Sequence, residues 1–286
     1  MSISKTFHFS ASEGVEIAAS SYGSNQHRSV LMLHGAGQTR HSWHRSALKI
    51  AESGFHVVTV DTRGHGDSSW SRNEDYSLDT LIADLQGIVQ QLSGDRPFVV
   101  GASLGGITAL LAQGETSEPL FGALALVDIT PKIDMQGVAR ILDFMNRFAD
   151  GFETVHQAAN AVAVYKGKTA PSGSQNPEGL LKNLRLRDDG RYYWHWDPAL
   201  LDHVSGFGDE VMERQRSAAR SLELPVLLLH GKLSEIVSDA HAEDFLALVP
   251  HARYVDVAQA SHMLATDNND IFANAIVEFL LESAEN

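Results

Sequence analysis

Cysteine is absent from the 286 residues of this chain, which excludes disulfide bonds, thiolate metal sites and a cysteine nucleophile. Basic residues are also scarce: 22 Lys and Arg stand against 36 Asp and Glu, for a formal net charge of −14. A surface this acidic repels nucleic acids and anionic membranes. We therefore expect neither a nucleic-acid partner nor a membrane partner.

Long apolar segments are missing as well. No run approaches the roughly 20 consecutive apolar residues that a transmembrane helix needs. The first 12 residues contain no apolar stretch behind a basic segment, so we expect no signal peptide. Together with the lack of cysteine, this predicts a cytoplasmic protein. Hydrophobic residues nevertheless make up 43% of the chain and charged residues 20%, values typical of a folded domain with a substantial core.

Short apolar runs alternate with helical patterns in the first half of the chain. Runs that suit buried parallel strands cover residues 29–33, 55–60, 97–101 and 123–127, and helical periodicity lies between them, as at 78–92. Two alternating segments near the N-terminus favour an antiparallel hairpin. This rhythm of strand, helix and strand predicts an α/β fold with a doubly wound, mostly parallel sheet.

The rhythm stops between residues 131 and 222, where helical patterns dominate, and strand signals return at 225–229 and 252–257. We predict an eight-stranded α/β core made of residues 1–130 and 223–286, with an inserted helical cap of residues 131–222. Such a cap would lie over the carboxyl ends of the strands, where open α/β sheets bind ligands. Most cap aromatics are expected to pack within the cap. Four are candidates for lining an apolar substrate pocket: Phe144, Tyr165, Trp194 and Trp196.

The segment from Gly101 to Gly105 matches the G-x-S-x-G pattern of a nucleophile elbow, a sharp turn between a strand and a helix that exposes a serine. The bare pattern is common by chance, but here it directly follows an apolar strand run and directly precedes a helical one. Small residues flank Ser103 on both sides, as the strained turn requires. The amide groups of the new helix would also stabilise negative charge there. Ser103 is therefore the candidate nucleophile.

Together with this elbow, three further motifs give the chain a resemblance to the α/β-hydrolase superfamily. The segment 34–37 (His-Gly-Ala-Gly) is similar to the oxyanion loop of that family, and 61–68 to its Asp-x-Arg-Gly-x-Gly-x-Ser segment. Ser261-His262 is similar to its C-terminal histidine. In detail the chain resembles the capped subgroup that contains lactonases, C–C bond hydrolases, cofactor-free haloperoxidases and epoxide hydrolases. Epoxide hydrolases carry aspartate at the elbow, so the serine found here favours acyl transfer.

The resemblance, together with the position of His262 after the last strand, implies that His262 is the general base that takes the proton of Ser103. The oxyanion hole would consist of the backbone N–H groups of Ala36 and Leu104. His34 and His65 also lie in motif loops, where packing and hydrogen bonding are the expected roles. No metal or organic cofactor is needed for this chemistry.

Two carboxylates are candidates for the acid of the catalytic triad. Most family members have an aspartate three residues after the glycine that closes the penultimate strand; here that glycine is Gly231, and the position holds Ser234. Glu235 follows at once. Asp128 ends an earlier strand, and neighbouring strands lie only about 4.8 Å apart. We prefer Asp128, because a serine fills the usual place and Asp128 lies at a rigid strand end, and we keep Glu235 as the alternative.

These residues predict a serine hydrolase that cleaves a carboxylic ester or lactone of a small, partly apolar substrate through an acyl-enzyme. A C–C bond hydrolase, or a perhydrolase or haloperoxidase, would use the same triad. A ligand sensor that keeps the fold without turnover is the alternative from another functional class.

Overall fold

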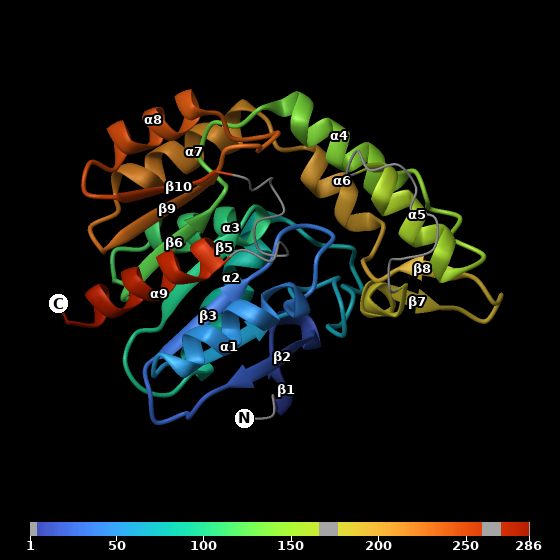
Figure 1. The fold of residues 1–286 in the computed structure, drawn as a ribbon, viewed down its shortest axis with the longest axis horizontal. Helices are drawn as coiled ribbons and strands as arrows, with labels where there is room; N and C mark the ends of the chain where they lie inside the picture. Colours follow the sequence, from blue (N-terminus) through green and yellow to red (C-terminus); the bar gives the residue numbers. More distant parts are fainter. Residues whose placement is uncertain (1–4, 166–176, 259–269, 286) are drawn as a thin grey trace.

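The computed structural model describes residues 5–165, 177–258 and 270–285. An eight-stranded sheet forms the centre of the molecule, with the strand order β1-β2-β4-β3-β5-β6-β9-β10 (Figure 1). The first two strands join it antiparallel, and every other neighbouring pair is parallel. The strands are β1 (Lys5–Ser10), β2 (Glu16–Tyr22), β3 (Ser29–Leu33), β4 (His56–Val60), β5 (Phe98–Ala102), β6 (Ala123–Val127), β9 (Val226–Gly231) and β10 (Arg253–Val257). The predicted α/β fold and its mostly parallel eight-stranded sheet are confirmed.

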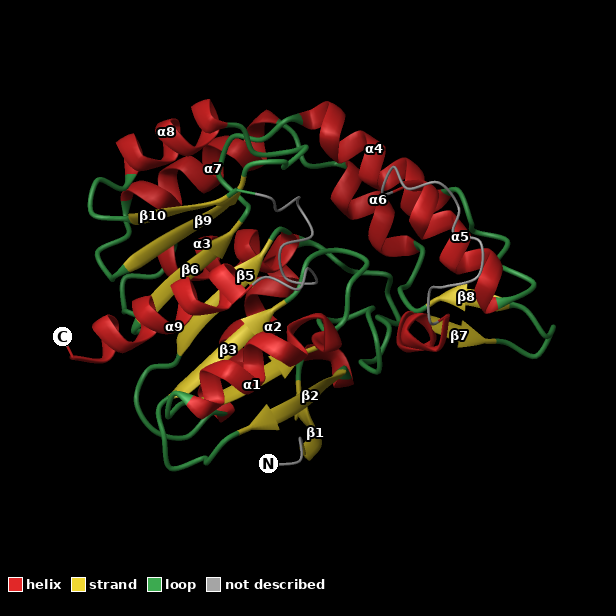
Figure 2. Ribbon diagram, in the orientation of Figure 1, coloured by secondary structure: helices red, strands yellow, loops and turns green. Residues whose placement is uncertain are grey.

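Helices cover both faces of this sheet (Figure 2). On one face α1 (His44–Glu52) packs beside α9 (Asp270–Glu285), and on the other α2 (Leu78–Gln91) and α7 (Asp209–Arg220) flank α3 (Leu104–Gly114). Further along this second face, α8 (Asp239–Leu248) packs beside α7. Successive residues of β3 point into two different cores: Val30 and Met32 into the first, Leu31 and Leu33 into the second. This explains why the central strands are apolar throughout, since both of their faces are buried.

The chain between β6 and β9 adds no strand to the main sheet within its described residues. Its described residues up to 205 form a lobe at the right of Figure 1, made of three helices, a short 3-10 segment and a hairpin. These are α4 (Met135–Asn146), α5 (Val155–Tyr165), η3 (Pro177–Asn183), β7 (Leu184–Leu186), β8 (Tyr192–Trp194) and α6 (Ala199–Ser205). The pairing of β7 with β8 is antiparallel and forms a sheet of its own, an element that the helical prediction for this range missed.

The helix α7 also lies inside the range predicted to form the cap, yet it packs against α3 of the core. The two helices approach so closely that a Cβ on Gly114 would come within 2.4 Å of the carbonyl oxygen of Ala218. We therefore propose that the separately packed cap ends before α7 begins at Asp209. Across the described part of the chain, no helix combines the length and the apolar character that crossing a membrane requires.

Candidate active site

Ser103 lies between the end of β5 and the first turn of α3. Its backbone has φ 46° and ψ −118°, a left-handed conformation that costs a non-glycine residue about 1–3 kcal/mol. Its N–H donates to the carbonyl of Val127 on β6, at 3.4 Å, and its carbonyl accepts the N–H of Ile107 in α3. The local geometry is therefore a strained strand-to-helix turn with a half-buried serine at its tip.

The loop after β3 runs directly beside this serine. A Cβ placed on Gly35 would lie 3.1 Å from the Cβ of Ser103 and 3.7 Å from its Oγ, so a side chain there would crowd the Cβ of the serine. A Cβ on Gly105 would come within 2.7 Å of the carbonyl oxygen of His34, so α3 also depends on glycine to approach this loop. Of the predicted oxyanion donors, Ala36 follows Gly35 in this loop, and Leu104 is the first residue of α3, whose N–H has no partner within its own helix.

Two buried histidines of the core hold this loop in place. The Nε2 atom of His34 accepts the N–H of Thr62 at 3.0 Å, while its Nδ1 bonds the carbonyl of Gly35 at 2.8 Å. The Nε2 atom of His65 accepts the N–H of Gly37 at 3.1 Å. A ring nitrogen that accepts a hydrogen bond must be unprotonated, so both rings are neutral. Burial agrees with this, because it lowers the pKa of His34 to about 4 and that of His65 to about 3.

A third buried histidine, His195, joins the cap to the same loop. Its Nδ1 accepts the N–H of Gly66 at 2.8 Å, and its Nε2 lies 3.3 Å from the carbonyl oxygen of Gly37, to which it donates. Burial holds the pKa of His195 well below its usual range. Sequence reasoning missed this residue: its only signal was the aromatic run from Tyr192 to Trp196, which indicates packing and does not indicate a contact with a loop about 160 residues away.

Asp61, the first residue of the 61–68 motif, organises its own turn. It pairs with the guanidinium of Arg40, and its Oδ1 accepts the backbone N–H of Arg40 at 2.6 Å. Its Oδ2 accepts the N–H of Asp67 at 2.8 Å. Both oxygens of this carboxylate are therefore used by Arg40 and by the turn that Asp61 begins.

Asp128 is fully buried at the end of β6, with a φ of 50°. Its N–H donates to the carbonyl of Leu229 on β9 at 2.7 Å. Its carboxylate accepts the N–H of Gly231 on Oδ1 at 2.9 Å and the hydroxyl of Ser234 on Oδ2 at 2.6 Å. The serine in the family's usual aspartate position therefore binds the carboxylate that comes from the neighbouring strand.

Glu235 is placed differently. Its side chain is exposed and forms an ion pair with Arg140 of α4, where Oε2 and Nε are 3.5 Å apart. His262 lies outside the described residues, so its contact with either carboxylate stays a prediction. Of the two acid candidates, Asp128 alone is buried and bonded at the strand ends beside the elbow.

The four predicted pocket aromatics form one cluster in the cap. Phe144 stacks on Tyr165 with ring centroids 4.3 Å apart, and Trp194 stacks on Trp196 at 5.0 Å. Phe144 and Trp194 join the two pairs at 6.0 Å. The cluster reaches the oxyanion loop, since a Cβ on Gly37 would lie 3.4 Å from the ring of Trp196. Much of the aromatic surface is used in this packing, and a role in substrate binding stays a prediction.

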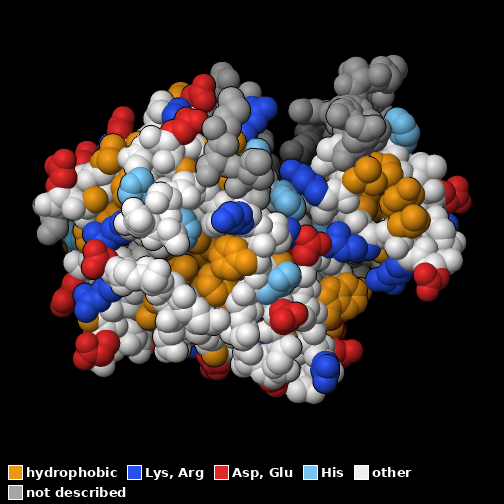
Figure 3. Space-filling view, turned by 90° about the horizontal axis from the view of Figure 1, so that it is seen from below, with side chains coloured by type: hydrophobic (Ala, Val, Ile, Leu, Met, Phe, Trp, Pro, Cys, Tyr) orange, Lys and Arg blue, Asp and Glu red, His pale blue; other side chains and the backbone are white. Residues whose placement is uncertain are grey.

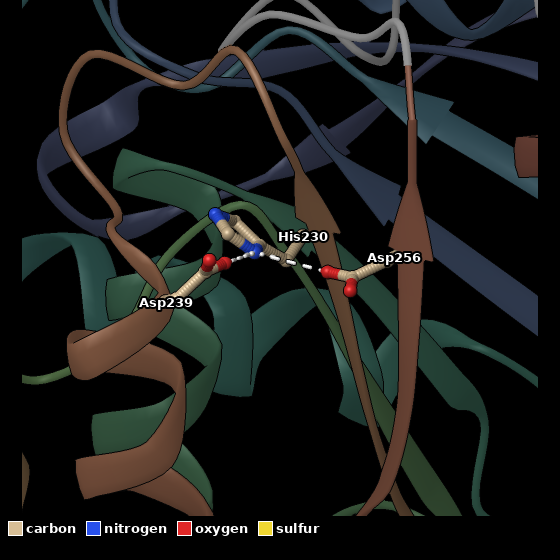
Figure 4. A group of neighbouring side chains, drawn as sticks. All are labelled: His230, Asp239 and Asp256. Carbon is tan, nitrogen blue, oxygen red and sulfur yellow. Dashed lines mark hydrogen bonds and ion pairs between the residues drawn. The ribbon is translucent and has the colours of Figure 1, made fainter.

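One cluster of possible metal ligands lies between β9, β10 and the start of α8 (Figure 4). The ligand atoms of His230, Asp239 and Asp256 lie within 4.8 Å of one another. The ammonium of Lys232 already bridges the two carboxylates, at 2.7 Å from Asp239 and 3.0 Å from Asp256. A metal ion would have to displace the ammonium group of Lys232, so we interpret the cluster as an ion-pair network at the edge of the sheet.

Comparison with known proteins agrees with this geometry. The chain is similar to the esterase Rv0045c of Mycobacterium tuberculosis, with 27% identity covering 88% of this chain and 82% of that protein. A solved structure of that esterase matches with a TM-score of 0.73 at 26% identity, covering 100% of this chain and 93% of the other.

Two further relatives have different activities in their names. The sn-1-specific diacylglycerol lipase ABHD11 of Mus musculus is 28% identical, covering 88% of this chain and 80% of that protein. A non-heme haloperoxidase of Rhodococcus erythropolis is 25% identical, covering 94% of this chain and 97% of that protein.

The family model described as the alpha/beta hydrolase fold matches residues 28–268. With the sheet order and the elbow described above, the resemblance inferred from the motifs is confirmed: the chain belongs to the α/β-hydrolase family.

Proposed function

We propose that this protein is a serine hydrolase that cleaves a carboxylic ester or lactone of a small, partly apolar substrate. The observation that carries the proposal is the strained elbow at Ser103, whose hydroxyl has the backbone of Gly35 beside it. Conformational strain at a non-glycine residue persists only where the surrounding structure enforces it, and it is concentrated at functional sites. Relatives whose names describe an esterase and a lipase support the same class of reaction.

In the proposed reaction, Ser103 Oγ bonds to the carbonyl carbon of the substrate while its proton passes to His262. The N–H groups of Ala36 and Leu104 stabilise the negative charge on the carbonyl oxygen. The bond to the leaving oxygen then breaks, and that oxygen takes the proton from His262. Water, deprotonated by His262, next attacks the acyl carbon. The bond to Ser103 breaks, the proton returns to its Oγ, and the carboxylic acid leaves.

We propose Asp128 as the acid that orients His262, with Glu235 as the alternative. Two contacts support Asp128: the N–H of Gly231 and the hydroxyl of Ser234 fix its carboxylate at the strand ends. Such a carboxylate holds the imidazole in the tautomer that can accept the serine proton, and it stabilises the imidazolium that forms. Glu235 would first have to leave its ion pair with Arg140.

The cap aromatics Phe144, Tyr165, Trp194 and Trp196 are proposed to border the acyl or leaving-group pocket. Their cluster reaches Gly37 in the oxyanion loop. The indole Nε1 of Trp194 is buried and has no hydrogen-bond partner within the described ranges. A buried donor without a partner costs about 1–3 kcal/mol, and a polar oxygen of a bound substrate would remove that cost.

A serine-directed aryl phosphonate tests the central assignment. We expect it to add covalently to the wild-type protein and not to Ser103→Ala, with the adduct located by mass spectrometry on the peptide that contains residue 103. Labelling of Ser103→Ala at the wild-type rate would refute the nucleophile. Stoichiometric labelling of the wild type with no turnover of any ester would instead favour the ligand-sensor alternative.

A substrate panel separates the remaining activities. Aryl esters, lactones and dienoic diketones, each supplied to wild type and Ser103→Ala, distinguish ester from C–C bond hydrolysis. The haloperoxidase relative gives a specific reason to test a second acceptor. Adding hydrogen peroxide to an ester assay would reveal perhydrolase activity through formation of peracid. We expect ester or lactone hydrolysis to be the fastest of these reactions.

A further inference from the structure

An open groove of about 650 Å³ lies where the loop after β4 meets the cap hairpin. Asp67 and Trp70 line it from the loop, and Arg185, Arg187 and His195 line it from the cap. Neither Ser103 nor Asp128 belongs to its lining. Its size falls in the range of small-molecule sites, about 300–1,000 Å³. The groove is therefore a candidate binding site whose described lining includes neither of these two residues.

Among the described residues that line the groove, Asp67 is the one carboxylate, and both of its oxygens are already bonded. Its Oδ2 bonds the guanidinium of Arg40 at 2.8 Å, and its Oδ1 bonds that of Arg185 at 2.7 Å. Arg40 in turn pairs with the buried Asp61. These four groups balance one another in charge, so the guanidinium of Arg187 gives the groove one positive charge in excess. Asp189, in the turn of the same hairpin, does not line the groove; its carboxylate accepts the backbone N–H of Arg191 at 2.9 Å and the hydroxyl of Tyr193 at 2.7 Å.

Arg187 is held in a position suited to an anionic ligand. Its guanidinium stacks on the ring of Tyr193, 4.0 Å from the ring centroid, and among the described residues it forms no ion pair with a carboxylate. Stacking covers the face of a guanidinium and leaves its N–H edges open. Those edges match the geometry of a carboxylate or phosphate, to which they can donate two parallel hydrogen bonds.

Trp70 supplies an apolar surface in the same groove. Its side chain is 40% exposed, although large aromatic groups are usually buried. Viewed from below, Lys and Arg side chains gather along the boundary between the larger body and the smaller lobe (Figure 3). On a chain with a net charge of −14, a guanidinium that forms no ion pair with a described carboxylate is the feature that would draw an anion to one place on the surface.

We propose that this groove binds a small organic anion, whose flat apolar part lies on Trp70 and whose carboxylate or phosphate accepts hydrogen bonds from Arg187. The excess of a single positive charge matches one anionic group. The cationic edge and the aromatic face together select against neutral ligands and against inorganic anions without an apolar part. This site does not depend on the activity of Ser103.

The probes for the test are 1-naphthoate, its neutral isostere 1-naphthamide, and 1-naphthyl phosphate, titrated calorimetrically into the full-length protein. We expect one site for the anions, and binding of 1-naphthamide at least about tenfold weaker, the fold-change that corresponds to ~1.5 kcal/mol for a charged hydrogen bond. The carboxylate and phosphate arms show which anion the groove prefers. Ser103→Ala should bind the anions like wild type, which keeps this result distinct from any failure of the proposed catalysis.

Variants locate the site. Arg187→Gln should weaken 1-naphthoate binding by about tenfold. Arg187→Lys keeps the charge but lacks the planar guanidinium that stacks on Tyr193, so its affinity for 1-naphthoate should lie between that of Arg187→Gln and that of wild type. Arg253→Gln is the matched control, because Arg253 is also a partly exposed arginine but pairs with Glu278 and Glu282 at the opposite edge of the sheet. Equal affinity of wild type and Arg187→Gln, equal affinity for naphthoate and naphthamide, or no binding of either anion at millimolar concentration would each overturn the proposal.

Discussion

Replacing Asp128 by asparagine tests which carboxylate completes the triad. Asparagine keeps an acceptor for the N–H of Gly231 but puts an NH₂ group where Oδ2 now accepts the hydroxyl of Ser234. That hydroxyl oxygen already accepts the N–H groups of Ile236 and Val237, at 3.2 and 3.1 Å, so it has little capacity for another donor. We expect a stability loss of about 1–3 kcal/mol, typical of one unsatisfied buried polar group.

The catalytic loss should be much larger. In a well-studied serine protease, the same change of triad acid lowers kcat about 10⁴-fold, which corresponds to roughly 5.5 kcal/mol of activation free energy. We expect a decrease near that size for Asp128→Asn. Glu235→Gln breaks only an exposed ion pair with Arg140, an interaction worth at most about 1 kcal/mol. Its kcat should fall by no more than a few-fold.

The assay is steady-state hydrolysis of an aryl ester by purified variants, with urea unfolding of each variant measured in parallel. Urea unfolding is needed because a variant that is partly unfolded loses activity in proportion to its unfolded fraction, whereas the triad effect persists in fully folded protein. A crippled Glu235→Gln variant beside an active Asp128→Asn variant would refute the assignment of Asp128. Modest losses in both single variants and a large loss in the double variant would mean that the two carboxylates substitute for each other.

Three further predictions concern the surroundings of the site. Ser234→Ala removes a hydrogen bond to the buried carboxylate of Asp128, worth about 1.5–3 kcal/mol, so kcat should fall about 10- to 100-fold. Ser234→Thr, which keeps the hydroxyl, should retain activity. A wild-type kcat in Ser234→Ala would contradict the role of this contact. Burial lowers the pKa of His34 to about 4 and that of His65 to about 3. The stability that their neutral forms contribute is therefore complete above the ordinary pKa of 6.5 and is lost as pH falls toward 4. A free energy of unfolding, measured in urea, that stays constant between pH 6.5 and 4 would contradict this prediction. Trp194→Phe should raise KM if its indole N–H binds substrate. Trp43→Phe, which removes another buried N–H without a partner in the described structure, should leave KM unchanged. Equal KM values in the two variants would exclude Trp194 from the pocket.

Local patterns determined the strands and the elbow in advance of any structure. The predicted strand runs agree with β3, β4, β5, β6, β9 and β10 to within two residues. For all of these except the edge strand β10, the reason is that a strand buried on both faces must be largely apolar. The elbow could be recognised because part of its constraint is also local: a Cβ on Gly101 would come within 2.7 Å of the carbonyl oxygen of Gly105, so the turn around Ser103 needs glycine there. Residues within ten positions of one another carried all of this information.

Other features depended on contacts between distant segments, and the sequence pattern did not reveal them. The helix α7 has the same kind of pattern as the cap helices, and only its packing against α3 assigns it to the core. The strands of the cap hairpin are three residues long, too short for a periodic signal. His195 reads as one more residue of an aromatic run, yet it bonds Gly66 and Gly37.

The acid of the triad illustrates the same division. The sequence by itself determined that the usual aspartate position holds Ser234 and that Asp128 ends a buried strand, because both facts follow from local order along the chain. Only the tertiary structure decided that this serine donates to that carboxylate, across 106 positions of sequence. A hydrogen bond forms where two backbones bring donor and acceptor within about 3 Å, and that distance is set by the pairing of β6 with β9 and not by either residue's neighbours in sequence.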